Sequence, residues 1–199
     1  LLTLLAGEGG GDGGWSMKNF ADNTRGFIGD AGDGLTLSGN TANVSVFSTG
    51  NSIGGFIGRN DAGNNLTVTG CTLNGGIISG ADNVGGCCGE IIGNHGNSNS
   101  ISNTYIHANI KGANYVGGLC GLSENRYHTI NLNNCGFLGE ITGSSNVGGL
   151  VGKVRKISDY NADNIQKCFA IGSISATGDY AGGLIGYDEG YYYTKLYDN

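Results

Sequence analysis

The chain alternates short apolar runs with glycine-rich polar turns, and one phrase of this pattern recurs along it. The phrase "NVGGLVGK" at 146–153 has the counterparts "RGFIGD" at 25–30, "GGFIGR" at 54–59, "GGCCGE" at 85–90, "GGLCGL" at 117–122 and "GGLIGY" at 182–187. Aligned on the second glycine or its equivalent, the six copies lie 29, 31, 32, 31 and 34 residues apart. A period near 31 residues, sustained in this way, predicts stacked copies of one structural unit.

The remainder of each unit also repeats, as in "INLNNCGFLGEITGSSNVGG" and "NIQKCFAIGSISATGDYAGG". Each unit holds three short alternating stretches and no helical period, which suits one coil of a β-solenoid whose strands pair with their counterparts one coil along. We therefore predict an all-β, parallel β-helix-like solenoid of about six coils of roughly 31 residues over 23–187. Residues 1–22 are predicted to form a glycine-rich entry or cap segment, and 188–199 a tyrosine-rich C-terminal cap or interface segment.

The strand after each glycine corner is apolar at two neighbouring positions, although neighbouring strand side chains face opposite ways. The first column is Phe27, Phe56, Cys87, Leu119, Leu150 and Leu184, and the second is Ile28, Ile57, Cys88, Cys120, Val151 and Ile185. Either the corner turns both columns into the core, or the first column is a surface ridge that another chain covers. We favour the first arrangement, because Gly-Gly permits the bend.

Composition and charge narrow the class of protein. With 41 glycines, no proline, 38% hydrophobic and 13% charged residues, the chain has neither the period of collagen nor the composition of a disordered segment. The net charge of −6, with Lys153, Arg155 and Lys156 as the only basic cluster, makes nucleic acid an unexpected partner. No apolar run approaches the roughly 20 residues that a membrane-spanning helix requires.

The pattern "NVGGLVGK…IQKCFAIGSISATGDYAGGLIGY" resembles the GLUG repeat, named for its Gly-Leu-rich phrase and found in large secreted or surface-anchored proteins, many of them adhesin-like. The resemblance runs from about Gly26 onward and is best in the later four units. Cysteine stands in several places where members of the family usually carry Tyr, Leu or Val. The resemblance implies an architectural module with an extracellular or cell-surface location.

We therefore expect a non-catalytic structural or adhesive module of a larger surface protein or filament, which uses no metal and no cofactor. A polysaccharide-binding or polysaccharide-cleaving β-helix protein is the alternative. Cleavage would need clustered carboxylates, whereas the aspartates scatter over different turns, at Asp30, Asp33, Asp61, Asp82, Asp159 and Asp179. The three histidines, His95, His107 and His128, also fall at different repeat positions.

Six cysteines invite a disulfide interpretation. Cys88 aligns with Cys120 and Cys135 with Cys168 in neighbouring units, and coils about 4.8 Å apart fall within the roughly 4.4–6.8 Å Cα separation of disulfides. The alternative is that these residues are small buried apolar side chains of a core column. Cys87 and Cys88 are expected to point in opposite directions along a strand, and Cys71 and Cys87 have no aligned partner.

Two places are candidates for contact with partners. Variation in length is concentrated between the GGxxG strand and the next unit's first strand, which predicts a binding edge that includes Arg59, Asp61, His95, Arg126, Tyr127, His128, Arg155, Asp159 and Tyr160. The second place is the tail, where Tyr191, Tyr192, Tyr193 and Tyr197 are expected to cap the last coil or to form an assembly interface. The expected partners are further copies or neighbouring domains of a longer chain, together with a host or environmental glycan or protein.

Overall fold

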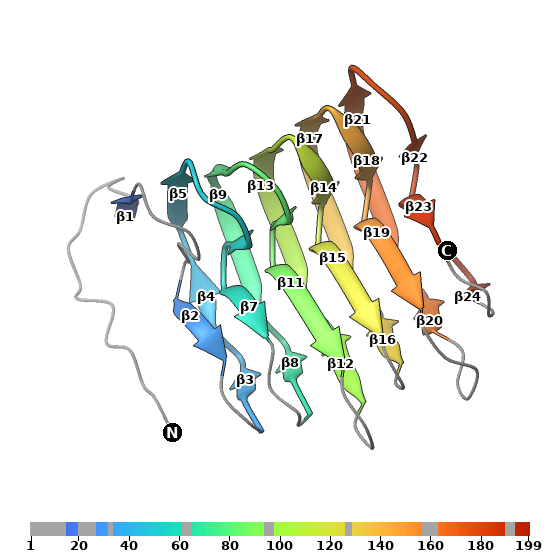
Figure 1. Cartoon of the computed structure of the whole chain (residues 1–199). Coiled ribbons are helices and arrows are strands. Elements are labelled where there is room, and N and C mark those ends of the chain that lie inside the picture. The colour runs from blue at the N-terminus through green and yellow to red at the C-terminus, as the bar shows by residue number, and fades with distance from the viewer. Residues whose placement is uncertain are drawn as a thin grey trace.

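The computed structural model describes residues 27–31, 34–60, 65–93, 98–125, 129–156, 163–189 and 194–199, with the backbone alone for 15–19 and 125. Over these residues the regular structure consists of β-strands, which stack as parallel neighbours in four sheets along one axis (Figure 1). The sheets hold five to seven strands each, so the chain makes about five complete coils. The predicted class, a parallel all-β solenoid, is confirmed, and the expected six coils are close to the number observed.

We label the four sheets A, B, C and D, and each coil passes through them in the order B, C, A, D. Sheet B contains β2 (Ile28–Ala31), β7 (Ile57–Asn60), β11 (Cys88–Gly93), β15 (Cys120–Asn125), β19 (Val151–Lys156) and β23 (Ile185–Asp188). Sheet C contains β3 (Thr36–Ser38), β8 (Thr67–Thr69), β12 (Asn99–Ser102), β16 (Ile130–Asn133), β20 (Asp163–Gln166) and β24 (Thr194–Tyr197).

Sheet A is the widest, and sheet D the narrowest. Sheet A contains β1 (Trp15–Asn19), β4 (Thr41–Ala42), β5 (Val44–Ser48), β9 (Thr72–Ser79), β13 (Tyr105–Lys111), β17 (Gly136–Gly143) and β21 (Phe169–Ala176). Sheet D contains β6 (Ile53–Gly54), β10 (Val84–Gly85), β14 (Asn114–Gly117), β18 (Ser145–Gly148) and β22 (Ala181–Gly182). The sequence predicts three strands in each coil; sheet D is the fourth, and its strands of two to four residues are too short to show alternation.

The strand register reproduces the spacing of the repeat. In sheet B, Ile57 pairs with Ile28 on one side and with Cys88 on the other, and Cys120 pairs with Cys88 and Val151. The last step, from Val151 to Ile185, has the longest of the predicted spacings. Every unit is therefore stacked on its neighbours in the alignment that the sequence predicts.

Both apolar columns beside the glycine corner point into the core in the interior coils. Phe56, Leu119 and Leu150 of the first column are fully buried, as are Ile57 and Val151 of the second. Only the two ends are partly open, where Phe27 is 37% exposed and Leu184 is half-buried. The arrangement that we favoured is confirmed, and the interior coils present no surface ridge at this column.

A shared carbonyl explains how two consecutive side chains both turn inward. The carbonyl oxygen of Leu119 accepts hydrogen bonds from the amides of both Cys87 and Cys88, each at 2.9 Å, and the same pattern recurs at the corners of Phe27, Phe56, Leu119 and Leu150. The first-column residue therefore lies outside the regular strand, which begins at the next residue. As a result the prediction that Cys87 and Cys88 point in opposite directions is wrong: both are buried, and their sulfur atoms lie 3.7 Å apart.

The corner needs glycine because the coils approach each other closely there. A Cβ atom added to Gly86 would lie 2.3 Å from the carbonyl oxygen of Gly118 in the next coil, and one added to Gly85 would lie 2.0 Å from the carbonyl oxygen of Cys88. These are backbone atoms held by the hydrogen bonds of the stack, so they have little freedom to move. The second glycine of the pair is therefore a steric requirement of stacking, and the first is required by the turn within its own coil.

The stack of strands extends into both predicted end segments. In the first, β1 pairs with β5 and adds a strand to sheet A before residue 23. In the last, β24 pairs with β20 and continues sheet C, so Tyr197 belongs to a strand whose neighbour is Gln166. Tyr191, Tyr192 and Tyr193 lie outside the described residues.

Candidate functional site

The predicted binding edge corresponds to one edge of the solenoid. In every coil the segment of variable length connects a strand of sheet B to the following strand of sheet C, so those strands end and begin along a common edge (Figure 1). Arg59 and Arg155 lie in β7 and β19 next to it. The remaining candidates lie outside the described residues, namely Asp61, His95, Arg126, Tyr127, His128, Asp159 and Tyr160.

Arg59 is part of a ladder of alternating charges on sheet B. Its register neighbours are Asp30 on one side and Glu90 on the other. The guanidinium Nε lies 3.4 Å from the Glu90 carboxylate, which also accepts a hydrogen bond of 2.6 Å from the Ser52 hydroxyl. Acidic and basic side chains interleave here, so this ladder gives no pair of neighbouring carboxylates for acid–base catalysis.

Arg155 belongs to a second charged cluster, which is centred on Lys153. The ammonium of Lys153 lies 2.6 Å from the Glu189 carboxylate, 5.2 Å from the ring centroid of Tyr115 and 5.3 Å from that of Tyr187. The hydrogen bond from Lys153 lowers the pKa of Glu189. Arg155 contacts Glu124 at 3.3 Å and Glu189 at 3.8 Å. The cations of this cluster therefore interact with the protein's own carboxylates and rings.

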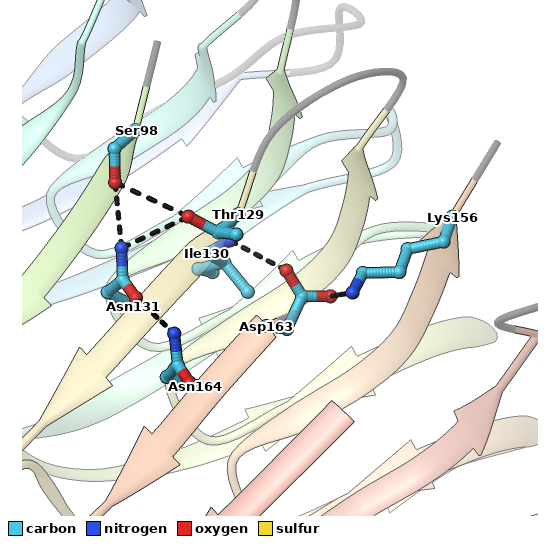
Figure 2. A network of polar contacts seen from close by, with 7 residues as sticks. All are labelled: Ser98, Thr129, Ile130, Asn131, Lys156, Asp163 and Asn164. Atoms are coloured by element: carbon cyan, nitrogen blue, oxygen red, sulfur yellow. Dashed lines mark hydrogen bonds and ion pairs between the residues drawn. The ribbon is translucent and has the colours of Figure 1, made fainter. Parts of the chain in front are cut away.

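The residues directly before and after the 157–162 segment, Lys156 and Asp163, form a buried ion pair. Figure 2 shows the ammonium of Lys156, at the end of β19, facing the carboxylate of Asp163, at the start of β20; the two atoms are 3.7 Å apart and the side chains 1% and 0% exposed. The other carboxylate oxygen of Asp163 accepts a hydrogen bond of 2.8 Å from the amide of Ile130. The pair thus joins sheet B to sheet C beneath the variable edge.

Polar side chains continue this network along the outer face of sheet C. The side-chain amide of Asn131 donates a hydrogen bond of 2.7 Å to the hydroxyl of Ser98. The side-chain amide of Asn164 donates one of 2.9 Å to the side-chain oxygen Oδ1 of Asn131 (Figure 2). In the same sheet the hydroxyl of Ser102 donates to that of Thr69 at 3.0 Å. These hydrogen bonds cross from coil to coil, so they reinforce the stack.

The two predicted cysteine pairs lie in neighbouring coils, but all six cysteines are free thiols in the structure. Cys88 and Cys120 are register partners, and Cys135 and Cys168 precede the register partners Gly136 and Phe169. A hydrogen bond between Cys135 and Cys168 raises the pKa of Cys135 and lowers that of Cys168 to about 7. The disulfides have no support in this structure, and they stay a prediction for oxidised protein.

An apolar groove crosses the outer face of sheet A, and the sequence did not lead us to it. Tyr105 and Phe169 lie on either side of Gly136 in the register, with ring centroids 6.3 Å apart. Leu138 and Ile171 lie beside them, and the four side chains are 38% to 58% exposed. The groove has a volume of about 190 Å³ and extends from Thr72 to Ile171 across β9, β13, β17 and β21.

A signal for this groove exists in the sequence. Strand β13 alternates exposed and buried positions without interruption, so Tyr105 and Leu138 occupy outward positions on a face where polar side chains are expected. The alignment of the units places Tyr105, Gly136 and Phe169 in one column, with a glycine between two aromatic residues. Reading the outward column in the same way as the inward ones would have identified the groove.

No family model, curated protein or solved structure matches the chain. The resemblance to the GLUG repeat therefore stays a prediction. In the described parts of the chain, no group of three or more His, Cys, Asp or Glu side chains is arranged to hold a metal ion. None of the described segments forms a helix of the length and apolar character needed to cross a membrane.

Proposed function

We propose that the chain is a non-catalytic structural and adhesive module of an extracellular or cell-surface protein. The observation that carries this proposal is the gathering of four exposed apolar side chains, Tyr105, Leu138, Phe169 and Ile171, on one outer face of a rigid stack. Exposed apolar side chains that gather on a soluble surface are typical of contact sites. The stacked coils hold their positions fixed, which reduces the entropy lost on binding.

The GLUG resemblance supports the same proposal, because repeats of that kind occur in secreted and surface-anchored proteins. The alternative is a polysaccharide-cleaving β-helix enzyme. On sheet B the ladder of Asp30, Arg59 and Glu90 disfavours it, because a basic side chain separates the two carboxylates. The two proposals differ in what happens to a bound polymer: an adhesive module retains it intact, and an enzyme shortens it.

Adhesion is tested with purified protein on surfaces coated with neutral polysaccharides, acidic polysaccharides, extracellular-matrix proteins or whole cells. Saturable retention on at least one surface, without release of soluble fragments, is the expected result. Retention on none of them would overturn the adhesive proposal. Reproducible chain cleavage, abolished by replacing acidic side chains, would favour the enzyme.

Assembly is the second part of the proposal. Among the described residues, each of β21, β22, β23 and β24 has a strand partner on one side, and Leu196 and Tyr197 of β24 are 52% and 45% exposed. Such an edge is a template for further strands, which a second copy or the next domain of a longer chain would supply. Analytical ultracentrifugation tests self-association: assembly at high concentration supports it, and a monomer under the same conditions contradicts assembly through this chain's own ends.

A further inference from the structure

The chemistry of the sheet A groove restricts what it can bind. Among the described residues, its lining consists of apolar side chains and glycine, with polar groups from Thr72, Asn74 and His107 and the hydroxyl of Tyr105, and includes no Asp, Glu, Lys or Arg. The chain as a whole carries a net charge of −6. A strongly acidic ligand would therefore find no cation in the groove and would be repelled by the rest of the molecule.

A peptide strand is a poor occupant of this groove. The strands beneath it, β13 and β17, are paired on both sides, so their backbone amides and carbonyls are engaged in sheet A. Strand addition requires an unpaired edge, and the groove runs over the face of the sheet. Only alternating side chains of a peptide would contact the groove, without hydrogen bonds to the backbone.

A second copy of the chain is also a poor occupant. A stable interface buries roughly 800 Å² on each partner, whereas the apolar surface here consists of four partly exposed side chains. Two copies that met at this face would each bring the same net negative charge. The groove is better matched to a narrow ligand that lies along it.

The walls of the groove favour a ring-shaped ligand with an apolar face. Gly136 leaves room for the ring of Phe169: a Cβ added there would lie 2.3 Å from Cζ of that ring. The Phe169 ring therefore lies over the glycine and leans towards Tyr105, at an interplanar angle of 36°. Two aromatic surfaces side by side can each pack against the C–H groups of a sugar ring, while amide and imidazole groups bond to its hydroxyls.

We propose that this groove binds a neutral polysaccharide, with sugar rings against Tyr105 and Phe169 and the sugar chain lying along the solenoid axis. The inference rests on the proposed adhesive function and names its ligand class. The groove crosses four strands, and three strand spacings correspond to about 14 Å, a length that suits a short run of sugar rings. Asn74 and His107 lie at the side of the groove and donate hydrogen bonds to the hydroxyls.

The test measures binding to a neutral β-glucan, a neutral mannan and an acidic polygalacturonate by affinity electrophoresis. The double variant Tyr105→Ala with Phe169→Ala removes both rings. The variant Gly136→Ala keeps them but displaces the Phe169 ring, because the three atoms nearest to the added Cβ all belong to that ring. Tyr180→Ala is the matched control, since Tyr180 is an exposed tyrosine, 54% exposed, that stacks on Tyr187 away from the groove.

The unaltered protein should bind a neutral polysaccharide more strongly than the acidic one. The double variant should bind it about tenfold or more weakly, Gly136→Ala should also lose affinity, and Tyr180→Ala should bind as the unaltered protein does. Circular dichroism and urea unfolding establish that each variant keeps the solenoid. If the double variant is unfolded, Gly136→Ala with the Tyr180→Ala control decides the question.

Three results would overturn the inference. The first is equal binding by the double variant, the second is stronger binding to the acidic polymer, and the third is failure of the unaltered protein to bind either neutral polymer. In each case retention on cells or matrix proteins would leave the adhesive function standing, so the two proposals can fail separately.

Discussion

Substituting Gly86 by alanine tests the claim that close stacking of the coils dictates the repeated glycine pair. The added Cβ would lie 2.3 Å from the carbonyl oxygen of Gly118 and 2.5 Å from Cγ2 of Ile106. To relieve these close contacts the coils would have to separate. Their separation would weaken the hydrogen bonds of Gly86 to Gly117 at 3.3 Å and to Gly55 at 3.1 Å. Overpacking of a core costs about 1–3 kcal/mol, and contact with fixed backbone places this variant at the upper end of that range.

The end of the stack provides a matched control. Gly183 occupies the same position in the last coil, and a Cβ added there would meet no atom within 4 Å. Gly183→Ala should therefore change the free energy of unfolding by less than about 0.5 kcal/mol. A loss of about 3 kcal/mol in Gly86→Ala corresponds to a fall in melting temperature of about 6–12 °C for a chain of this size.

Thermal and urea unfolding, followed by circular dichroism, measure both variants. Equal stability of Gly86→Ala and Gly183→Ala would refute the steric explanation of the repeat. A large loss in both variants would show that the last coil is also covered in solution, in agreement with assembly at that end.

Three further predictions follow from the polar and sulfur groups. Asp163→Asn keeps an acceptor for the Ile130 amide but leaves the buried Lys156 ammonium facing a neutral group. Urea unfolding should therefore show that the free energy of unfolding falls by about 3 kcal/mol or more. A change near zero would contradict the importance of the ion pair. Lys153→Met removes the contact with Glu189 and two ring contacts and should cost about 1 kcal/mol at neutral pH. Because Lys153 lowers the pKa of Glu189, this contribution is present above the ordinary carboxyl pKa of 4.5 and is lost as the pH falls through the lowered value in the folded state; an unchanged difference between the two proteins in acid would contradict it. Peptide mapping of unreduced, secreted protein should find Cys88–Cys120 and Cys135–Cys168 disulfide bonds. Oxidation of the second pair should accelerate as the pH rises through about 7, the pKa of Cys168. Recovery of all four cysteines as free thiols would rule the bonds out.

The coil and its register could be predicted from the sequence because the repeated positions are those at which packing allows only a few residue types. Glycine at the second corner position is demanded by the carbonyl of the next coil, so it recurs at a fixed spacing. The inward columns recur for the same reason, since each apolar side chain stacks on its counterpart. Sheet D was not predicted, because a strand such as Val84–Gly85 is too short to alternate.

The candidate site was harder to predict, because contact sites depend on the outward face. Tyr105, Leu138 and Phe169 stand in different units, and each by itself is an ordinary exposed apolar residue. Only the stacking of β13, β17 and β21 brings them into one groove. The Lys156–Asp163 pair depends in the same way on packing, since the residues between them give no signal that the two charges meet in the core.

The most direct test of the account is a crystal structure of the protein with an oligosaccharide of the neutral polysaccharide that it binds most tightly. We expect sugar rings against Tyr105 and Phe169, with the sugar chain along the solenoid axis and its glycosidic bonds intact. An oligosaccharide seated on another face of the stack, with the sheet A groove empty, would contradict the account.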